Sequence, residues 1–233
     1  MKEFDPPDLF DPRTSVLLCG SGRSLLRWVA YAFVAERPGG FFWGHVRMEG
    51  EVFEDTDLLK TQRLPRDRFI SVLPTELMRD ELAGNVALGG LMRSEEEDAQ
   101  VRRFADFLRL PKQTQDLFSR LPREGPSPVL VLSGGQRLAA LYSLESVGPT
   151  VRSIVHFGGS MLMTWAEAPP AGRFEFERVL HLDGYETSKW RDAVLTVEIG
   201  WPTGPLQTGA KLRLRDVAPV ASVLRTTLGS SPR

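Results

Sequence analysis

A glycine turn at residues 20–24 holds the residue types and spacing best suited to chemistry in this chain. The turn consists of Gly20, Ser21, Gly22, Arg23 and Ser24. An apolar segment with the composition of a buried strand precedes it, and a segment with the composition of a helix follows. Such a turn directs backbone N–H groups and the positive end of the helix dipole toward any anion placed there. Arg23 adds a positive charge and Ser24 a hydroxyl able to ligate a metal ion, so the turn predicts a phosphate site.

The turn differs from the phosphate-loop motif G-x-x-x-x-G-K-[ST] in its length and in its cation. In that motif backbone N–H groups surround the phosphates, the Lys reaches the outer phosphates and the Ser or Thr binds Mg²⁺. Here Leu17, inside the expected strand, stands five residues before Gly22, so the turn is about three residues shorter. Arg23 replaces the Lys, and the two are not interchangeable where a point charge must fit. A plain strand-to-helix connection that needs glycine only to turn remains the alternative.

Hydrolysis of a nucleotide also needs acidic groups at two strand ends. The apolar segment 129–132 is the candidate for the strand that carries the magnesium carboxylate, but the next residue is Ser133. A catalytic base is expected after the strand at 40–48, where only Glu49 or Glu51 could serve. These changes together predict a fold that is retained and a catalytic activity that is lost.

Strands alternate with helices in the first part of the sequence, and strands follow one another in the last part. Strands are expected at 15–19, 40–48, 68–73, 127–132, 160–165, 174–182, 192–200 and 211–215, and helices at 24–35, 76–85, 95–110 and 137–144. This order predicts an α/β domain with a mostly parallel central sheet and an antiparallel C-terminal extension. The domain is expected over residues 14–222, after an irregular lead-in at 1–13 that contains three prolines. Residues 223–233 are expected to form a flexible tail.

Composition excludes several classes of protein. The 233 residues are 42% hydrophobic, which suffices for one full core. The 29 basic and 30 acidic side chains give a net charge of −1, without the basic excess of a nucleic-acid-binding domain. Cys19 is the single cysteine, so no internal disulfide or cysteine-based structural zinc site can form. No apolar run has the roughly 18 residues of a membrane span, and the N-terminus is polar and broken by proline, so a cytoplasmic protein is expected.

In order and spacing, residues 12–218 resemble the RecA-type ATPases closest to KaiC. The resemblance includes an apolar strand with a Leu/Ala-rich segment after it at 129–142, a strand containing threonine at 161–167, and a hairpin at 174–198. It implies a three-layer RecA-like P-loop NTPase fold, with ATP and Mg²⁺ as ligands of the turn. Only Gly22 and Ser24 match that family's loop as they stand. The resemblance therefore implies a degenerate ATPase homologue that has no catalytic residues and acts in a regulatory or scaffolding role. Its partner would be another protein or a second copy of the chain. Whether it still binds nucleotide stays open.

Two alternatives follow from the same residues. The first is an active ATPase in which Arg23 replaces the lysine and Glu49 or Glu51 is the base. The second is an ATPase of the ABC-transporter type, because residues 132–137 read Leu-Ser-Gly-Gly-Gln-Arg and match the LSGGQ signature of that family. That family continues within about 20 residues to a strand ending in Asp-Glu, whereas residues 147–159 here contain no acidic residue.

Other residues able to do chemistry are expected to be structural. His45, His156 and His181 are too far apart in sequence to indicate a metal site and suit the core or edge of a sheet. Ser133 lacks the G-x-S-x-G context of a nucleophile elbow, because residue 131 is Val. The tryptophans at 165, 190 and 201 are expected to pack beside strands.

Overall fold

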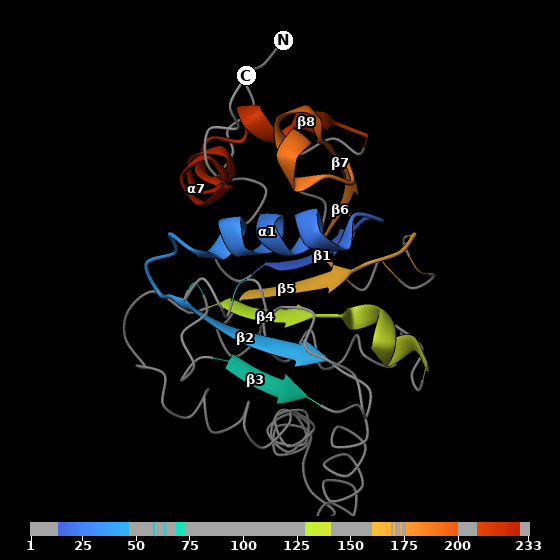
Figure 1. Cartoon of the computed structure of the whole chain (residues 1–233). Helices are drawn as coiled ribbons and strands as arrows, with labels where there is room; N and C mark the ends of the chain where they lie inside the picture. The colour runs from blue at the N-terminus through green and yellow to red at the C-terminus, as the bar shows by residue number, and fades with distance from the viewer. Residues whose placement is uncertain are drawn as a thin grey trace, which may run out of the picture.

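A computed structural model describes residues 14–46, 58, 63, 69–72, 129–140, 160–168, 170, 173, 176–199 and 209–228 of the chain. The lead-in at 1–13, the expected helices at 76–85 and 95–110, and Glu49 and Glu51 lie outside these ranges. The described residues form one sheet with helices against one of its faces (Figure 1).

The sheet has eight strands in the order β3-β2-β4-β5-β1-β6-β7-β8. The pairs β2–β3, β2–β4, β4–β5, β1–β5 and β1–β6 are parallel, whereas β6–β7 and β7–β8 are antiparallel. The strands are β1 Ser15–Cys19, β2 Phe41–Val46, β3 Phe69–Val72, β4 Val129–Ser133, β5 Ser160–Trp165, β6 Arg178–Asp183, β7 Val194–Ile199 and β8 Lys211–Arg213. The expected α/β class, with a mostly parallel sheet and antiparallel C-terminal strands, is confirmed.

Helix α1, Arg23–Val34, follows directly on the glycine turn and is buried along most of its length. It lies between the sheet and helix α7, Ala218–Leu228, and all three contribute to one hydrophobic core. Helix α1 ends at Val34, shortly before Pro38, which cannot continue a helix, and Gly40, with φ of 69°, directs the chain into β2. Burial against two neighbours, rather than helix propensity, stabilises α1.

Both faces of the sheet are buried at its centre. Val16 and Leu18 of β1 join the core beneath α1, and the alternation of a strand places Leu17 on the opposite face. Leu17 is fully buried as well, and so are Met161 and Met163 of β5. Strands buried on both faces read as continuous apolar runs, and this is how 15–19, 129–132 and 160–165 appear in the sequence.

Every strand expected from the sequence overlaps an observed one, but several bounds and helices differ. The strand expected at 174–182 begins at Arg178, and the one expected at 211–215 ends at Arg213, where a 3-10 helix follows. The 3-10 helix Thr187–Asp192 was not expected.

The segment expected as a helix over 137–144 begins as a 3-10 helix, Gly135–Ala140, because it starts directly from a tight turn in which Arg137 N donates to Gly134 O. A flexible tail was expected from residue 223 onward, but the structure places residues 223–228 in helix α7. Helix α7 continues to Leu228 because its apolar side chains Val223 and Leu224 are buried in the core.

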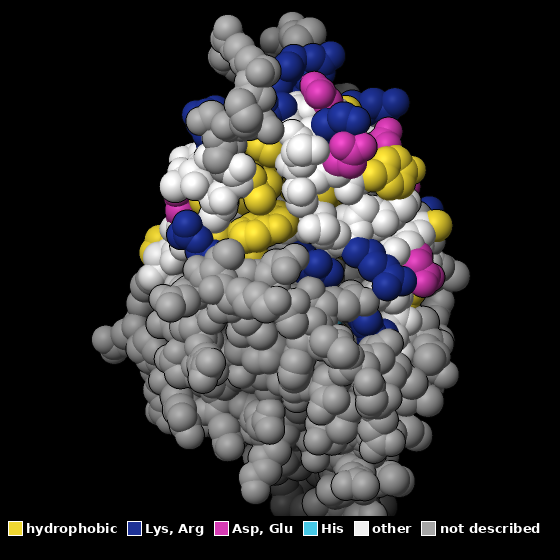
Figure 2. Space-filling view, viewed as in Figure 1, with side chains coloured by type: hydrophobic (Ala, Val, Ile, Leu, Met, Phe, Trp, Pro, Cys, Tyr) yellow, Lys and Arg dark blue, Asp and Glu magenta, His cyan; other side chains and the backbone are white. Residues whose placement is uncertain are grey.

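On the face seen in Figure 2, the described basic and acidic side chains are interspersed over the C-terminal part of the chain. Among the described residues, no helix is long and apolar enough to cross a membrane.

We predict that Leu224→Ala lowers the free energy of unfolding by about 2–5 kcal/mol, because the buried leucine leaves a cavity. Ser222→Ala, at an exposed position of the same helix, should change it by less than about 0.5 kcal/mol. Denaturant unfolding of both variants measures the difference. A free energy that Leu224→Ala leaves unchanged would mean that the end of α7 does not pack on the core.

Candidate functional site

The glycine turn lies against the end of β6. Gly20 N donates to Trp165 O at 3.1 Å, which ties the turn to β5. A Cβ atom at Gly20 would lie 2.7 Å from Leu182 O, and one at Gly22 would lie 2.5 Å from Gly184 O. Both neighbouring atoms belong to backbone and cannot move aside cheaply. The chain's own backbone therefore requires glycine at both positions, without any ligand.

The N-terminus of α1 carries the positive charge of Arg23 and lacks a side-chain cap. Gly22 is the N-cap residue, no side chain caps it, and no acidic residue lies in the first turn. Ser21 and Arg23 are exposed, while Ser24 is half-buried. Arg23 N donates to Ser21 O at 3.1 Å, so one of the first N–H groups of the helix has an internal partner.

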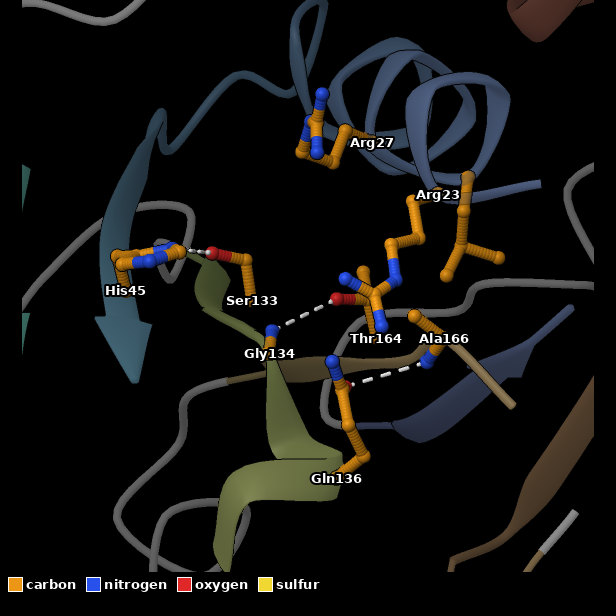
Figure 3. Close-up of a pocket in the computed structure, with 9 residues that line it drawn as sticks. Arg23, Arg27, His45, Ser133, Gly134, Gln136, Thr164 and Ala166 are labelled. Carbon is orange, nitrogen blue, oxygen red and sulfur yellow. Dashed lines mark hydrogen bonds between the residues drawn. The ribbon is translucent and has the colours of Figure 1, made fainter. Parts of the chain in front are cut away.

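A cavity lies beside this helix end, at the carboxyl ends of three parallel strands (Figure 3). Ligands of open α/β sheets characteristically bind at such strand ends. Its volume is about 10 Å³, which is about what one water molecule needs. The lining residues are Arg23, Leu26 and Arg27 of α1, His45 of β2, Ser133 of β4, Gly134 and Gln136 after β4, Thr164 of β5, and Ala166.

Ser133 is held by two side chains of β2. Its Oγ lies 2.9 Å from His45 Nδ1 and accepts a hydrogen bond from Trp43 Nε1 at 3.3 Å. All three residues are buried, with His45 only 1% exposed. Trp43 is the last ring in a series of edge-to-face contacts that runs from Trp28 on α1 through Tyr31 and Phe41. The core therefore fixes the position of the Ser133 hydroxyl.

Two further hydrogen bonds hold the turn after β4 against the end of β5. Gly134 N donates to Thr164 Oγ1 at 3.1 Å, and Ala166 N donates to Gln136 Oε1 at 3.2 Å. Gly134 has φ of 80°, a conformation that favours glycine. These bonds orient Thr164 and Gln136 at the cavity, opposite Arg23 and Arg27 (Figure 3).

The cavity has a positive electrostatic character. Two guanidinium groups line it, one turn apart on α1, and its described lining residues include no Asp or Glu. Over the part of the chain that the structure describes, no cluster of three or more His, Cys, Asp or Glu residues could hold a metal ion. The lining is thus suited to an anion rather than to a cation.

A second polar cluster lies on β6 and β7, away from this cavity. Glu198 Oε2 accepts a hydrogen bond from Arg173 Nε at 2.8 Å, and its Oε1 lies 3.2 Å from His181 Nε2. Burial by itself would raise the pKa of Glu198, but the Arg173 hydrogen bond and the charges of His181 and Arg173 together lower it. Cys19 is buried nearby at the end of β1. Burial, with a further contribution from Glu198, raises the pKa of its thiol to about 12.

Of the five turn residues predicted from the sequence, only Arg23 lines the cavity. Ser133 lies there as well, at the strand end where a carboxylate was sought. Arg27, Gln136 and Thr164 were missed as site residues, and His45 was interpreted as structural only. The signal for Arg27 was its spacing of four from Arg23, which places both on one helix face. For His45 and Thr164, the signal was their position near the ends of strands expected to be parallel.

Of the tryptophans expected to pack beside strands, Trp165 and Trp190 are both buried. Trp201 and His156 lie outside the described residues.

No family model matches this chain. No curated protein matches it either.

We predict that Gly22→Ala destabilises the protein by about 1–3 kcal/mol in the absence of any ligand, because the added methyl group would meet Gly184 O. Ser21→Ala, at the exposed neighbouring position, is the matched control and should have little effect. Thermal or denaturant unfolding without nucleotide measures both. Equal stability of the two variants would show that the turn does not need glycine for its contact with β6.

We predict that Cys19 resists thiol reagents in the native protein at pH 8. With a pKa of about 12, the thiolate fraction there is about 10⁻⁴, and the side chain is only 1% exposed. The thiol of the unfolded chain ionises above about pH 8.5, so this group also lowers stability as pH rises from there toward 12. Absorbance after addition of an aromatic disulfide, with and without denaturant, gives the two rates. Equally fast labelling of native and unfolded protein would contradict the prediction.

Proposed function

We propose that this protein is a degenerate RecA/KaiC-like ATPase homologue that does not hydrolyse ATP and acts through binding, in a regulatory or scaffolding role. The observation that carries the proposal is the position of Ser133. Its hydroxyl, at the end of β4, is engaged by His45 and Trp43, where an ATPase of this type would need a carboxylate for its magnesium shell. A neutral hydroxyl that two buried side chains already hold is a poor substitute for that carboxylate.

The arrangement of elements supports the ancestry part of the proposal. A strand, a glycine turn and a buried helix come first, and β4 and β5 end beside the same cavity as the start of α1. The antiparallel pair β6–β7 follows them in the chain. This is the order that the resemblance to RecA-type ATPases implies.

The geometry of the turn supports the loss of hydrolysis. Gly22 is in contact with the backbone of Gly184 and Tyr185, so the space beside it is occupied by protein. Arg23 lines a cavity of about 10 Å³, far smaller than a triphosphate. Both features favour a domain that retains a fold without the original catalytic site.

The two alternatives make different demands on the chain. An active ATPase needs Glu49 or Glu51, which lie outside the described residues, as its base. An ABC-type ATPase needs the LSGGQ residues at a surface where a second nucleotide-binding domain can reach them. Ser133 belongs to β4, in the interior of the sheet, and is only 2% exposed, which counts against the ABC interpretation.

We predict that the protein releases no phosphate from Mg-ATP above the rate of a buffer control, because the strand end at Ser133 lacks the magnesium carboxylate. Phosphate release by the full chain is measured with a coupled assay at millimolar Mg-ATP. A parallel melting curve tests nucleotide binding, since a ligand at 100 times its Kd stabilises the fold by about 2.7 kcal/mol.

Turnover abolished by Glu49→Gln or Glu51→Gln would overturn the proposal in favour of an active ATPase. Dimers that form only with ATP and are lost in Gly134→Asp would favour the ABC interpretation. Absence of both turnover and nucleotide-driven dimers leaves the binding role.

A further inference from the structure

The sheet side of the cavity presents hydrogen-bond donors. Thr164 Oγ1 accepts the Gly134 N–H bond, and a hydroxyl that accepts one bond can still donate its own proton. Gln136 Oε1 accepts a hydrogen bond from Ala166 N. Because a backbone N–H group can only donate, the amide atom that faces it must be the oxygen, and Gln136 Nε2 keeps its two N–H donors. Thr164 is only 3% exposed, so this donor surface is preformed inside the fold.

The helix side presents cations. Arg23 extends from α1 toward Thr164, and Arg27 comes from the next turn of the same helix (Figure 3). Guanidinium groups have only donors and bind planar or tetrahedral oxyanions through paired hydrogen bonds. A divalent cation placed here would meet two positive charges, and none of the described lining residues carries a carboxylate.

The size of the cavity limits how much of a ligand can enter it. A volume of about 10 Å³ admits one oxygen atom but not a whole oxyanion. The remaining atoms of such a ligand must stay at the mouth of the cavity, beside the exposed Arg23 and the half-buried Arg27. The glycine turn itself is not the binding surface, because Gly22 lies against the backbone of Gly184 and Tyr185.

We infer that this cavity binds a phosphate-class oxyanion without a divalent metal, with one oxygen directed at Thr164 and Gln136 and the others held between Arg23 and Arg27. This inference deepens the proposed function and rests on its claim that no carboxylate-held magnesium takes part. It places the anion on the side chains of α1 and at the ends of β4 and β5, and not in a cradle of turn N–H groups. The ligand is inorganic phosphate or the terminal phosphate of a larger molecule, which share this chemistry.

The test is calorimetric titration of the full chain with inorganic phosphate in EDTA, at ionic strength kept constant with sodium chloride. Saturable binding that added Mg²⁺ does not strengthen is expected. Arg23→Gln and Arg27→Gln should each weaken it about ten- to hundredfold, the loss expected for a hydrogen-bonded charge. Arg213→Gln, at an exposed position on the edge strand β8, is the matched control and should bind as the wild type does.

A second titration with ATP in EDTA identifies the source of the anion. Tighter binding of ATP than of phosphate, with the same dependence on both arginines, assigns the site to a phosphorylated molecule; the reverse order assigns it to free phosphate. Absence of saturable binding of either ligand in EDTA overturns the inference, and so does binding that both arginine variants leave unchanged. Phosphate release from Mg-ATP would overturn the non-hydrolysing function while leaving the EDTA titrations to judge the anion site separately.

Discussion

Burial of α1 between the sheet and α7 is the constraint on which the rest of the structure depends. Residues of α1 are buried against β1 and its neighbours on one side and against α7 on the other. A helix enclosed in this way can carry charge only where it emerges, and here Arg23 and Arg27 lie at its N-terminal end. Their position at the cavity is therefore a consequence of core formation, because the apolar side chains fix the rotation of the helix.

The opposite wall of the cavity depends on the same core. The ring contacts from Trp28 to Trp43 join α1 to β2, and the Trp43 N–H group ends at Ser133. Polar groups buried this deeply are costly unless they are hydrogen-bonded. His45, Trp43 and Gly134 meet that requirement for the hydroxyls of Ser133 and Thr164. The cavity is thus rigid on its sheet side, and Arg23, an exposed side chain, is the wall that can adjust to a ligand.

The fold was predictable from the sequence to the extent that short-range patterns dictate it. The apolar runs at 15–19 and 160–165 agree with β1 and β5 at both ends, because strands buried on two faces leave a continuous pattern. The domain was predicted to end at residue 222, which is too early. The polar residues 225–227 obscure the helical pattern to which the buried Val223 and Leu224 belong. The site was only partly predictable. Arg23 and Ser133 could be singled out by comparison with a known motif, but Thr164 and Gln136 meet them only through the pairing of β4 with β5, which no local spacing encodes.

The close approach of Gly22 to the end of β6 has a consequence for how such sequences change over generations. A glycine that serves only to admit a ligand is released from selection once the ligand is no longer used. Gly22 is under a different requirement, because any larger residue would collide with the carbonyl of Gly184 in every folded molecule. Selection for folding alone is then sufficient to preserve this glycine, whether or not the turn binds a ligand. A glycine pattern that resembles a phosphate loop can thus be one that natural selection keeps for an unrelated reason.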